Sequence, residues 1–321
     1  MKAFVQTGYG GPEVIELREL AVPVPEAGEV VVRVAAASLA AGDYFMMRGA
    51  PFPARLAIGF PKPKHDHVVG LDFAGTVEAV GPGVTGFEPG DPVYGECLGA
   101  CAEYARARTD RLARMPRSMT FAEAAGVPTS ACAALQGLRD QGKVQPGQHV
   151  LVNGASGGVG PFAVQIAKAL GAEVTGVCST GNVELVRSLG ADHVIDYTLE
   201  DFTRGGRRYD VILDNVASHH LAEARRALKP GGIHIPSSGH GGMRWIIAAA
   251  LTAPFTRQQG RPVEAKTTSA DLAALAELID AGRVRTVIDR VYSLAEVPDA
   301  FGYVDAGHAR GKVIIDVEGG A

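Results

Sequence analysis

The sequence predicts an α/β protein in which a β-rich, barrel-like domain accompanies a doubly wound parallel sheet. The first ~120 residues are rich in Val, Gly and Pro, and turn signals such as Gly81-Pro82-Gly83 divide them into short segments. We expect strands here at Lys2–Gln6, Val14–Leu20, Glu29–Ala37 and Leu71–Val80. From Phe121 onward apolar strands alternate with helical patterns, and one of these strands runs into a glycine-rich turn. Strands that alternate with helices predict a parallel sheet.

The elements of this second region are expected in a regular order. A helix over 121–138 comes first, followed by the strand 148–153, the helix 158–170, the strand 172–178 and the helix 182–189. Strands at 193–196 and 209–214 follow, and then the helix 221–228 and the strand 232–236. A further helix is expected over 244–251. The chain then returns to a helix containing Leu272, Leu275, Leu278 and Ile279, a strand at 286–292, a helix at 297–306 and a last strand at 312–317. Pairing of the last strand with the N-terminal strands would make the parallel region an insertion, which the sequence leaves open.

Composition narrows the class of protein. The 321 residues are 46% hydrophobic and 21% charged, which is typical of a globular protein, and the net charge of −4 predicts no nucleic-acid partner. No segment is long and apolar enough to span a bilayer, and no signal peptide is recognised, so we expect a cytoplasmic protein without a membrane partner. The four cysteines are scattered and lack the spacing of a zinc knuckle.

The segment 149–160 predicts the binding of a dinucleotide. Val150, Leu151 and Val152 form an apolar strand, three glycines follow at a spacing of three residues, and a helical pattern begins directly afterwards. Backbone N–H groups at the start of a helix bind a pyrophosphate well, because they point toward the positive end of the helix dipole. The residues expected to contact the cofactor here are Gly154, Ala155, Ser156, Gly157, Gly158, Val159 and Gly160.

The end of the next strand favours NADPH over NADH. Rossmann domains that select NADH place a carboxylate there to bind the ribose, whereas this strand ends in Ser179-Thr180. Hydroxyl groups can donate hydrogen bonds to the 2′-phosphate of NADPH, whereas a carboxylate would repel it.

The ordered motifs along nearly the whole chain resemble one family. They read Met1-Lys-Ala-Phe, Gly8-Tyr-Gly-Gly-Pro-Glu-Val-Ile-Glu-Leu17, Gly70-Leu-Asp-Phe-Ala-Gly-Thr-Val-Glu-Ala-Val-Gly81, Gly90-Asp-Pro-Val-Tyr-Gly95, the glycine turn, Leu189-Gly-Ala-Asp-His-Val-Ile-Asp-Tyr197 and Ala306-Gly-His-Ala-Arg-Gly-Lys-Val313. This order resembles the zinc-independent quinone oxidoreductase-like branch of the medium-chain dehydrogenases/reductases.

The resemblance implies a GroES-like catalytic domain at 1–122 and 263–321, an inserted Rossmann domain at 123–262, a substrate cleft between them and a homodimer. It also implies that Ser179 and Tyr197 hold the 2′-phosphate of NADPH. In the family a lysine usually joins these two residues, but this chain has Asn182 near that position. Arg187 is a candidate to supply the missing positive charge. Further cofactor contacts are expected from Thr129, at the nicotinamide amide, and from Asn215, Val216 and Ser238.

Zinc-dependent members of the wider family bind a catalytic metal through three side chains, and the resemblance places Ala40, Leu71 and Gly126 at those positions. None of these can coordinate zinc, so no metal is expected. His65 and His67 lie close together in the sequence and could be read as metal ligands, but we favour a solvated loop that contains two imidazole groups.

Without zinc, conjugated acceptors such as quinones and enones are the expected substrates, reduced by a hydride from NADPH. Tyr44 is a candidate hydrogen-bond donor to the substrate or a buried aromatic of the cleft wall, and Asp43 organises its loop or acts as a base. Arg48 is expected at the cofactor, at an acidic substrate or on the surface. The family often has Asn-Pro-x-Asp where this chain has Ala40-Ala-Gly-Asp43. A specialised biosynthetic-pathway reductase, a non-reductive enzyme and a catalytically silent NADPH-binding sensor therefore stay open as alternatives.

Overall fold

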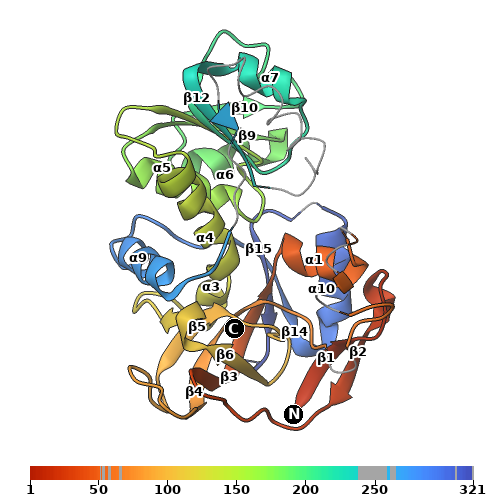
Figure 1. The fold of residues 1–321 in the computed structure, drawn as a ribbon. Helices are drawn as coiled ribbons and strands as arrows, with labels where there is room; N and C mark the ends of the chain where they lie inside the picture. Colours follow the sequence, from red (N-terminus) through yellow and green to blue (C-terminus); the bar gives the residue numbers. More distant parts are fainter. Residues whose placement is uncertain are drawn as a thin grey trace. The chain divides into compact units, whose positions relative to one another are not determined.

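The computed structural model divides the chain into two compact units. The first unit consists of Met1–Ser130, Thr267–Ala281 and Thr286–Ala321, and the second of Ala131–Lys266 and Gly282–Arg285 (Figure 1). The structure describes residues 1–50, 52, 55–56, 59–64, 67–237, 259–260, 265–307 and 309–319. The helix expected over 244–251 lies outside the described residues.

Within the described residues, the first unit is built on a seven-stranded sheet and a two-stranded sheet. The larger sheet has the order β14-β15-β3-β4-β5-β7, with β6 also paired to β3, and the smaller one pairs β1 with β2. The strands are β1 (Lys2–Gln6), β2 (Ile15–Glu19), β3 (Glu29–Leu39), β4 (Asp72–Val80), β5 (Pro92–Glu96), β6 (Tyr104–Arg108), β7 (Leu112–Arg114), β14 (Ile288–Ser293) and β15 (Lys312–Asp316).

The last strand returns to the N-terminal part of the chain. β15 pairs antiparallel with β3, with Val313 opposite Leu39 and Ile315 opposite Ala37. Figure 1 shows these segments from the two ends of the chain lying side by side. The β-branched side chains of Val30, Val32 and Ile315 are fully buried in the core of this unit, where such residues pack well against neighbouring strands. The pairing that the sequence left open is therefore present.

Helices of the first unit begin and end at recognisable residues. They are α1 (Ala41–Arg48), α3 (Phe121–Ala125), α9 (Ser269–Asp280) and α10 (Val297–Asp305). Gly49 ends α1 in the left-handed conformation with a φ of 61°, which glycine adopts without strain. Thr120 and Glu123 form a reciprocal capping box at the start of α3.

The helix expected over 121–138 is interrupted. α3 ends at Ala125, α4 begins at Pro128 and ends at Leu135, and a π-helical segment follows over Gln136–Gln141. Proline lacks a backbone N–H and disfavours helical geometry in the residue before it, so a new helix begins at Pro128. α4 contains the junction between the two units after Ser130.

The second unit contains a parallel sheet of six strands within its described residues, in the order β10-β9-β8-β11-β12-β13. The elements are β8 (His149–Asn153), α5 (Gly160–Ala169), β9 (Glu173–Cys178), α6 (Val183–Ser188), β10 (His193–Asp196), β11 (Tyr209–Asp214), α7 (Leu221–Arg226), β12 (Leu228–Pro236) and β13 (Gln259–Gly260). The chain moves outward from β8 to β10 and then resumes at β11 on the other side of β8. Doubly wound sheets bind ligands at this switch point, beyond the carboxyl ends of the strands.

Candidate active site

The glycine turn connects β8 to α5 at the switch point of the parallel sheet. Gly154 has a φ of 74°, a left-handed conformation that side chains rarely adopt. A Cβ atom on Gly160 would lie 2.1 Å from the carbonyl oxygen of Gly154, so the close approach of helix and turn requires glycine at that position. The N–H of Ala155 donates to the carbonyl of Val177 at 2.9 Å, which fixes the turn to β9.

The turn presents backbone donors that the protein leaves available. Ser156, Gly158 and Val159 are half-buried, and their N–H groups find no protein acceptor within the described part of the chain. Val159, the N-cap residue of α5, also makes no side-chain capping hydrogen bond. Such donors at the positive end of a helix suit an anion such as a pyrophosphate, so the residues present fit a dinucleotide.

A second loop lies against the turn. The side-chain amide of Asn215 donates to the carbonyl of Asn153 at 3.0 Å, and the Cγ2 atom of Val216 lies 2.8 Å from where a Cβ of Gly154 would stand. The structure thus brings Asn215 and Val216, two of the predicted cofactor residues, to the glycine turn. Ser238 lies outside the described residues.

The predicted 2′-phosphate residues gather beyond the carboxyl ends of β9 and β10. The Ser179 hydroxyl accepts the side-chain amide of Asn182 at 3.1 Å, and the Thr180 hydroxyl lies 3.1 Å from that of Thr198. Tyr197 donates its backbone N–H to Cys178 at 3.0 Å, and its side chain is 63% exposed. These hydroxyls are positioned to meet a ligand at the outer edge of the sheet.

Asp196 is a neighbour of this group that the sequence reasoning missed. It is aligned with Cys178 in the pairing of β10 with β9, so its carboxylate lies beside the end of β9. Hydrogen bonds from the side chains of Thr180 and Thr198 hold the pKa of Asp196 below its usual range. The sequence does not show this proximity, because Asp196 is 18 residues from Cys178 and only the register of β10 on β9 places the two residues side by side.

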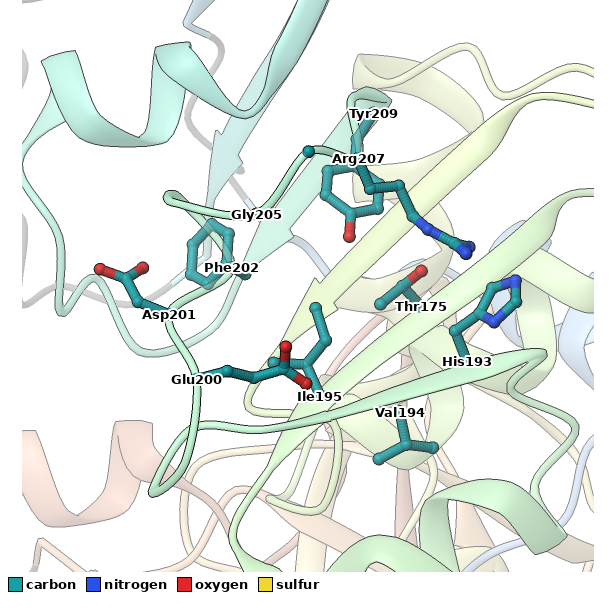
Figure 2. A pocket seen from close by; sticks show the side chains of 11 residues that line it. Thr175, His193, Val194, Ile195, Glu200, Asp201, Phe202, Gly205, Arg207 and Tyr209 are labelled. Atoms are coloured by element: carbon teal, nitrogen blue, oxygen red, sulfur yellow. The ribbon is translucent and has the colours of Figure 1, made fainter.

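A separate pocket of about 370 Å³ lies between β10 and the segment that leads to β11 (Figure 2). None of the predicted cofactor residues lines it. Its two basic side chains, His193 and Arg207, are engaged by Glu173 at 3.0 and 3.1 Å. Because both side chains already contact the Glu173 carboxylate, they are less available to a bound phosphate than the N–H groups of the glycine turn.

In the first unit, α1 carries the two predicted catalytic residues. Asp43 is 3% exposed, and its Oδ2 atom accepts the backbone N–H of Ala40 at 2.7 Å, which satisfies a donor at the start of the helix. Burial is the main cause that raises the pKa of Asp43 to about 7, with Asp72 adding to the shift and Lys312 opposing it. The Asp43 carboxyl therefore titrates near neutral pH.

Substitution of Asp43 by asparagine is expected to stabilise the protein at neutral and alkaline pH. The folded-state pKa of about 7 exceeds the ordinary value of 3.8, so the contribution of Asp43 to wild-type stability is greatest below pH 4 and is lost as the pH rises to 7. The shift of about three pKa units corresponds to roughly 4 kcal/mol. Asparagine still accepts the Ala40 N–H, so thermal melts from pH 4 to 9 should show the wild type losing stability relative to the variant. A constant difference between the two proteins across that range would contradict the assignment.

The other predicted residues of this unit have protein partners. Tyr44 is half-buried against the core, with the Arg48 guanidinium 5.4 Å from its ring centre. Arg48 itself forms a two-bond ion pair with Asp305 of α10. The ion pair fits the third of the roles expected for Arg48, that of a surface residue. The backbone N–H and the hydroxyl of Thr129 both donate to Asp72, so its polar groups are directed to that carboxylate.

Asp72 and Lys312 form a buried ion pair. Asp72 is fully buried and Lys312 is 1% exposed, with the Lys312 Nζ atom 3.4 Å from the carboxylate and 3.1 Å from the hydroxyl of Ser130. Burial is the first cause that raises the pKa of Asp72, whereas Lys312 and Thr129 lower it. The pair joins β4, β15 and α4.

The structure describes the three residues, Ala40, Leu71 and Gly126, that the resemblance places at the zinc-ligand positions. Ala40 is the residue before α1, the Leu71 side chain lies 3.3 Å from where a Cβ of Gly42 would stand, and Gly126 is the residue after α3. None of the three has a ligating side chain. Among the described residues, no group of three or more His, Cys, Asp or Glu side chains is arranged to hold a metal ion.

Comparison with known proteins identifies the family. Residues 26–137 match the alcohol dehydrogenase GroES-like domain, and residues 189–315 match a domain described as a zinc-binding dehydrogenase. The chain is 34% identical to the 2-methylene-furan-3-one reductase of Solanum lycopersicum, covering 98% of this chain and 79% of the relative. The chain belongs to the quinone oxidoreductase-like group of the medium-chain dehydrogenase/reductase family.

Further members of this family are similar over the same length. The chloroplastic NADPH-dependent alkenal/one oxidoreductase of Arabidopsis thaliana is 33% identical over 98% of this chain and 79% of the relative. The solved structure of the Coxiella burnetii quinone oxidoreductase superposes with a TM-score of 0.89 at 29% identity, covering 99% of each chain. These findings confirm the predicted fold, the family and the assignment as an oxidoreductase, and they support the use of NADH or NADPH.

No helix in the part of the chain that the structure describes is long and apolar enough to cross a membrane.

Proposed function

We propose that this oxidoreductase transfers a hydride from NADPH to a quinone, an enone or a similar activated alkene, without a catalytic zinc ion. The observation that carries the proposal is the glycine turn, whose unsatisfied N–H groups stand at the switch point of the parallel sheet. A bound NADPH supplies the hydride. The residues of this chain then have to bind the nucleotide, orient the acceptor and provide hydrogen bonds as negative charge develops.

The preference for NADPH is supported by the hydroxyl groups at the end of β9. Ser179, Thr180 and Tyr197 bring donors together there, and β9 itself ends without a carboxylate. The charge of Asp196 is directed to the Thr180 and Thr198 hydroxyls, which leaves Ser179 and Tyr197 to meet a 2′-phosphate. The Arabidopsis relative is named as NADPH-dependent.

The choice of a conjugated acceptor is supported by the residues at the zinc positions. Ala40, Leu71 and Gly126 cannot polarise a carbonyl through a metal ion. Conjugation spreads the charge that hydride attack creates, so hydrogen-bond donors can stabilise it. We assign Tyr44 as such a donor, and Asp43 as a positioning residue that holds the start of α1 through the Ala40 N–H. Similar chains are named as a quinone oxidoreductase homolog and as an alkenal/one oxidoreductase.

The proposal is tested by following NADPH oxidation with a simple quinone and with an enone. We expect turnover that a chelator does not reduce, with kcat/KM for NADPH at least about tenfold above that for NADH, equivalent to 1.4 kcal/mol. Loss of turnover in the chelator, restored by zinc, would overturn the metal-free assignment. Tight NADPH binding without turnover of any acceptor would instead indicate a nucleotide sensor.

A further inference from the structure

A buried polar network lies directly before the glycine turn, at the carboxyl ends of three neighbouring strands. Asn153 is the last residue of β8, Asp214 is the last residue of β11, and His234 lies in β12. Their side chains are 4%, 0% and 2% exposed. Buried polar side chains cost stability unless they are hydrogen-bonded, so a network of this kind at a strand end has to be satisfied internally.

Asp214 accepts the hydrogen bonds that hold this network together. Its Oδ1 atom accepts the Asn153 side-chain amide at 2.8 Å and the backbone N–H groups of Val216 and Ala217 at 3.1 and 2.8 Å. Its Oδ2 atom lies 3.2 Å from the Nε2 atom of His234. Burial raises the pKa of Asp214, but the bonds from His234 and Ala217 outweigh it and hold the pKa below its usual value. The carboxylate is therefore a charged acceptor that its donors satisfy.

The loop that Asp214 holds contains a strained residue. Ala217 has a φ of 56°, in the left-handed region that residues with a Cβ atom rarely occupy. Strained backbone of this kind persists where surrounding contacts fix it. Among the contacts of the described residues, the two N–H bonds from Val216 and Ala217 to Asp214 act directly on this bend.

The same loop touches the first residue of the glycine turn. The backbone N–H and the side-chain amide of Asn215 both donate to the carbonyl of Asn153, at 3.2 and 3.0 Å. Val216 packs so closely over Gly154 that a Cβ atom there would lie 2.8 Å from its Cγ2 atom. Both contacts are made by the two residues that directly precede the bend at Ala217.

We propose that Asp214 is a positioning residue that holds the loop 215–217 in its strained form against Gly154 and thereby sets the affinity for the nicotinamide nucleotide. This inference rests on the proposed binding of NADPH at the glycine turn. Asp214 acts through Val216 and Ala217 and is itself fully buried, so its role is separate from contact with the cofactor. It adds a residue to the site that the sequence pattern did not identify.

The test is a double-mutant cycle between Asp214 and Ala217, read as the Kd of NADPH from fluorescence titration. We expect Asp214→Ala to raise the Kd at least about thirtyfold while kcat at saturating NADPH changes less than about threefold. Ala217→Gly alone should change the Kd less than about twofold, because glycine adopts the same bend. In the Asp214→Ala background, Ala217→Gly should recover about tenfold of the lost affinity, since the bend then needs no carboxylate to hold it.

Asp210 provides a matched control on the same strand. It is the second residue of β11, at the end of the strand away from the turn, and it accepts hydrogen bonds from the His149 N–H and the Lys229 Nζ atom, each at 2.8 Å. Asp210→Ala should leave the Kd of NADPH unchanged. Wild-type affinity in Asp214→Ala, equal loss in Asp210→Ala, or no recovery by Ala217→Gly would each overturn the inference. If Gly157→Asp also bound NADPH normally, the proposed cofactor site itself would be wrong.

Discussion

Replacement of Lys312 by methionine is expected to lower the stability of the first unit by about 3–5 kcal/mol, because it leaves Asp72 buried without its cation. Lys312 is 1% exposed and Asp72 is fully buried, so neither charge is available to water. At about 2–4 °C per kcal/mol, the thermal midpoint should fall by roughly 6–20 °C. The measurement is a melt of the purified variant beside the wild type, followed by circular dichroism.

The double variant Asp72→Asn with Lys312→Met provides the control. It removes both charges, and the asparagine oxygen still accepts the N–H and hydroxyl of Thr129, so most of the lost stability should return. If the double variant were as unstable as Lys312→Met alone, the loss would come from packing around the Lys312 methylene groups instead of the unpaired carboxylate.

Replacement of Gly157 by aspartate is expected to weaken NADPH binding by more than a hundredfold. A Cβ atom at Gly157 has its nearest neighbour, the Gly154 oxygen, at 3.7 Å, so the side chain fits without moving the turn. The new carboxylate would face a pyrophosphate bound at the N–H groups of the turn. At roughly 5 Å and an effective dielectric constant of about 20, two like charges repel by about 3 kcal/mol. Titration of cofactor fluorescence measures the change.

Two variants at the same position separate charge from volume. Gly157→Ala adds a methyl group in ordinary contact, and Gly157→Asn has the shape of aspartate without its charge. We expect both to bind NADPH within about tenfold of the wild type. If the asparagine variant lost as much affinity as the aspartate variant, crowding would explain the loss, and undiminished binding by Gly157→Asp would place the pyrophosphate elsewhere.

The order of strands and helices was predictable because it depends on local patterns. The apolar run of β8, the glycines after it and the alternation through β12 are all visible in a short window of sequence. Helix α1 was missed, since Ala41-Gly42 is a weak start and the stabilising acceptor is the Asp43 side chain turned back to Ala40. The break at Pro128 was also missed within a pattern that otherwise predicts a single helix.

The glycine turn could be recognised for the same local reason, whereas the buried polar partners could not. Asp72 and Lys312 are 240 residues apart, and Asp214 meets Asn153 across 61 residues. The pairing of both β15 and β4 with β3, and of β11 with β8, brings such side chains together. The sequence shows that each residue is polar in an apolar stretch, but the partner that permits burial follows from the tertiary fold.

Transfer of deuterium is the most direct test of the proposed reaction. NADPH carrying deuterium at C4 of the nicotinamide, prepared separately on each face, is incubated with the enzyme and an enone, and the product is analysed by mass spectrometry and NMR. The account predicts that one of the two labelled forms places a single deuterium on the β-carbon of the product. Reduction without deuterium from either form, or consumption of the enone with NADPH unchanged, would contradict hydride transfer by this protein.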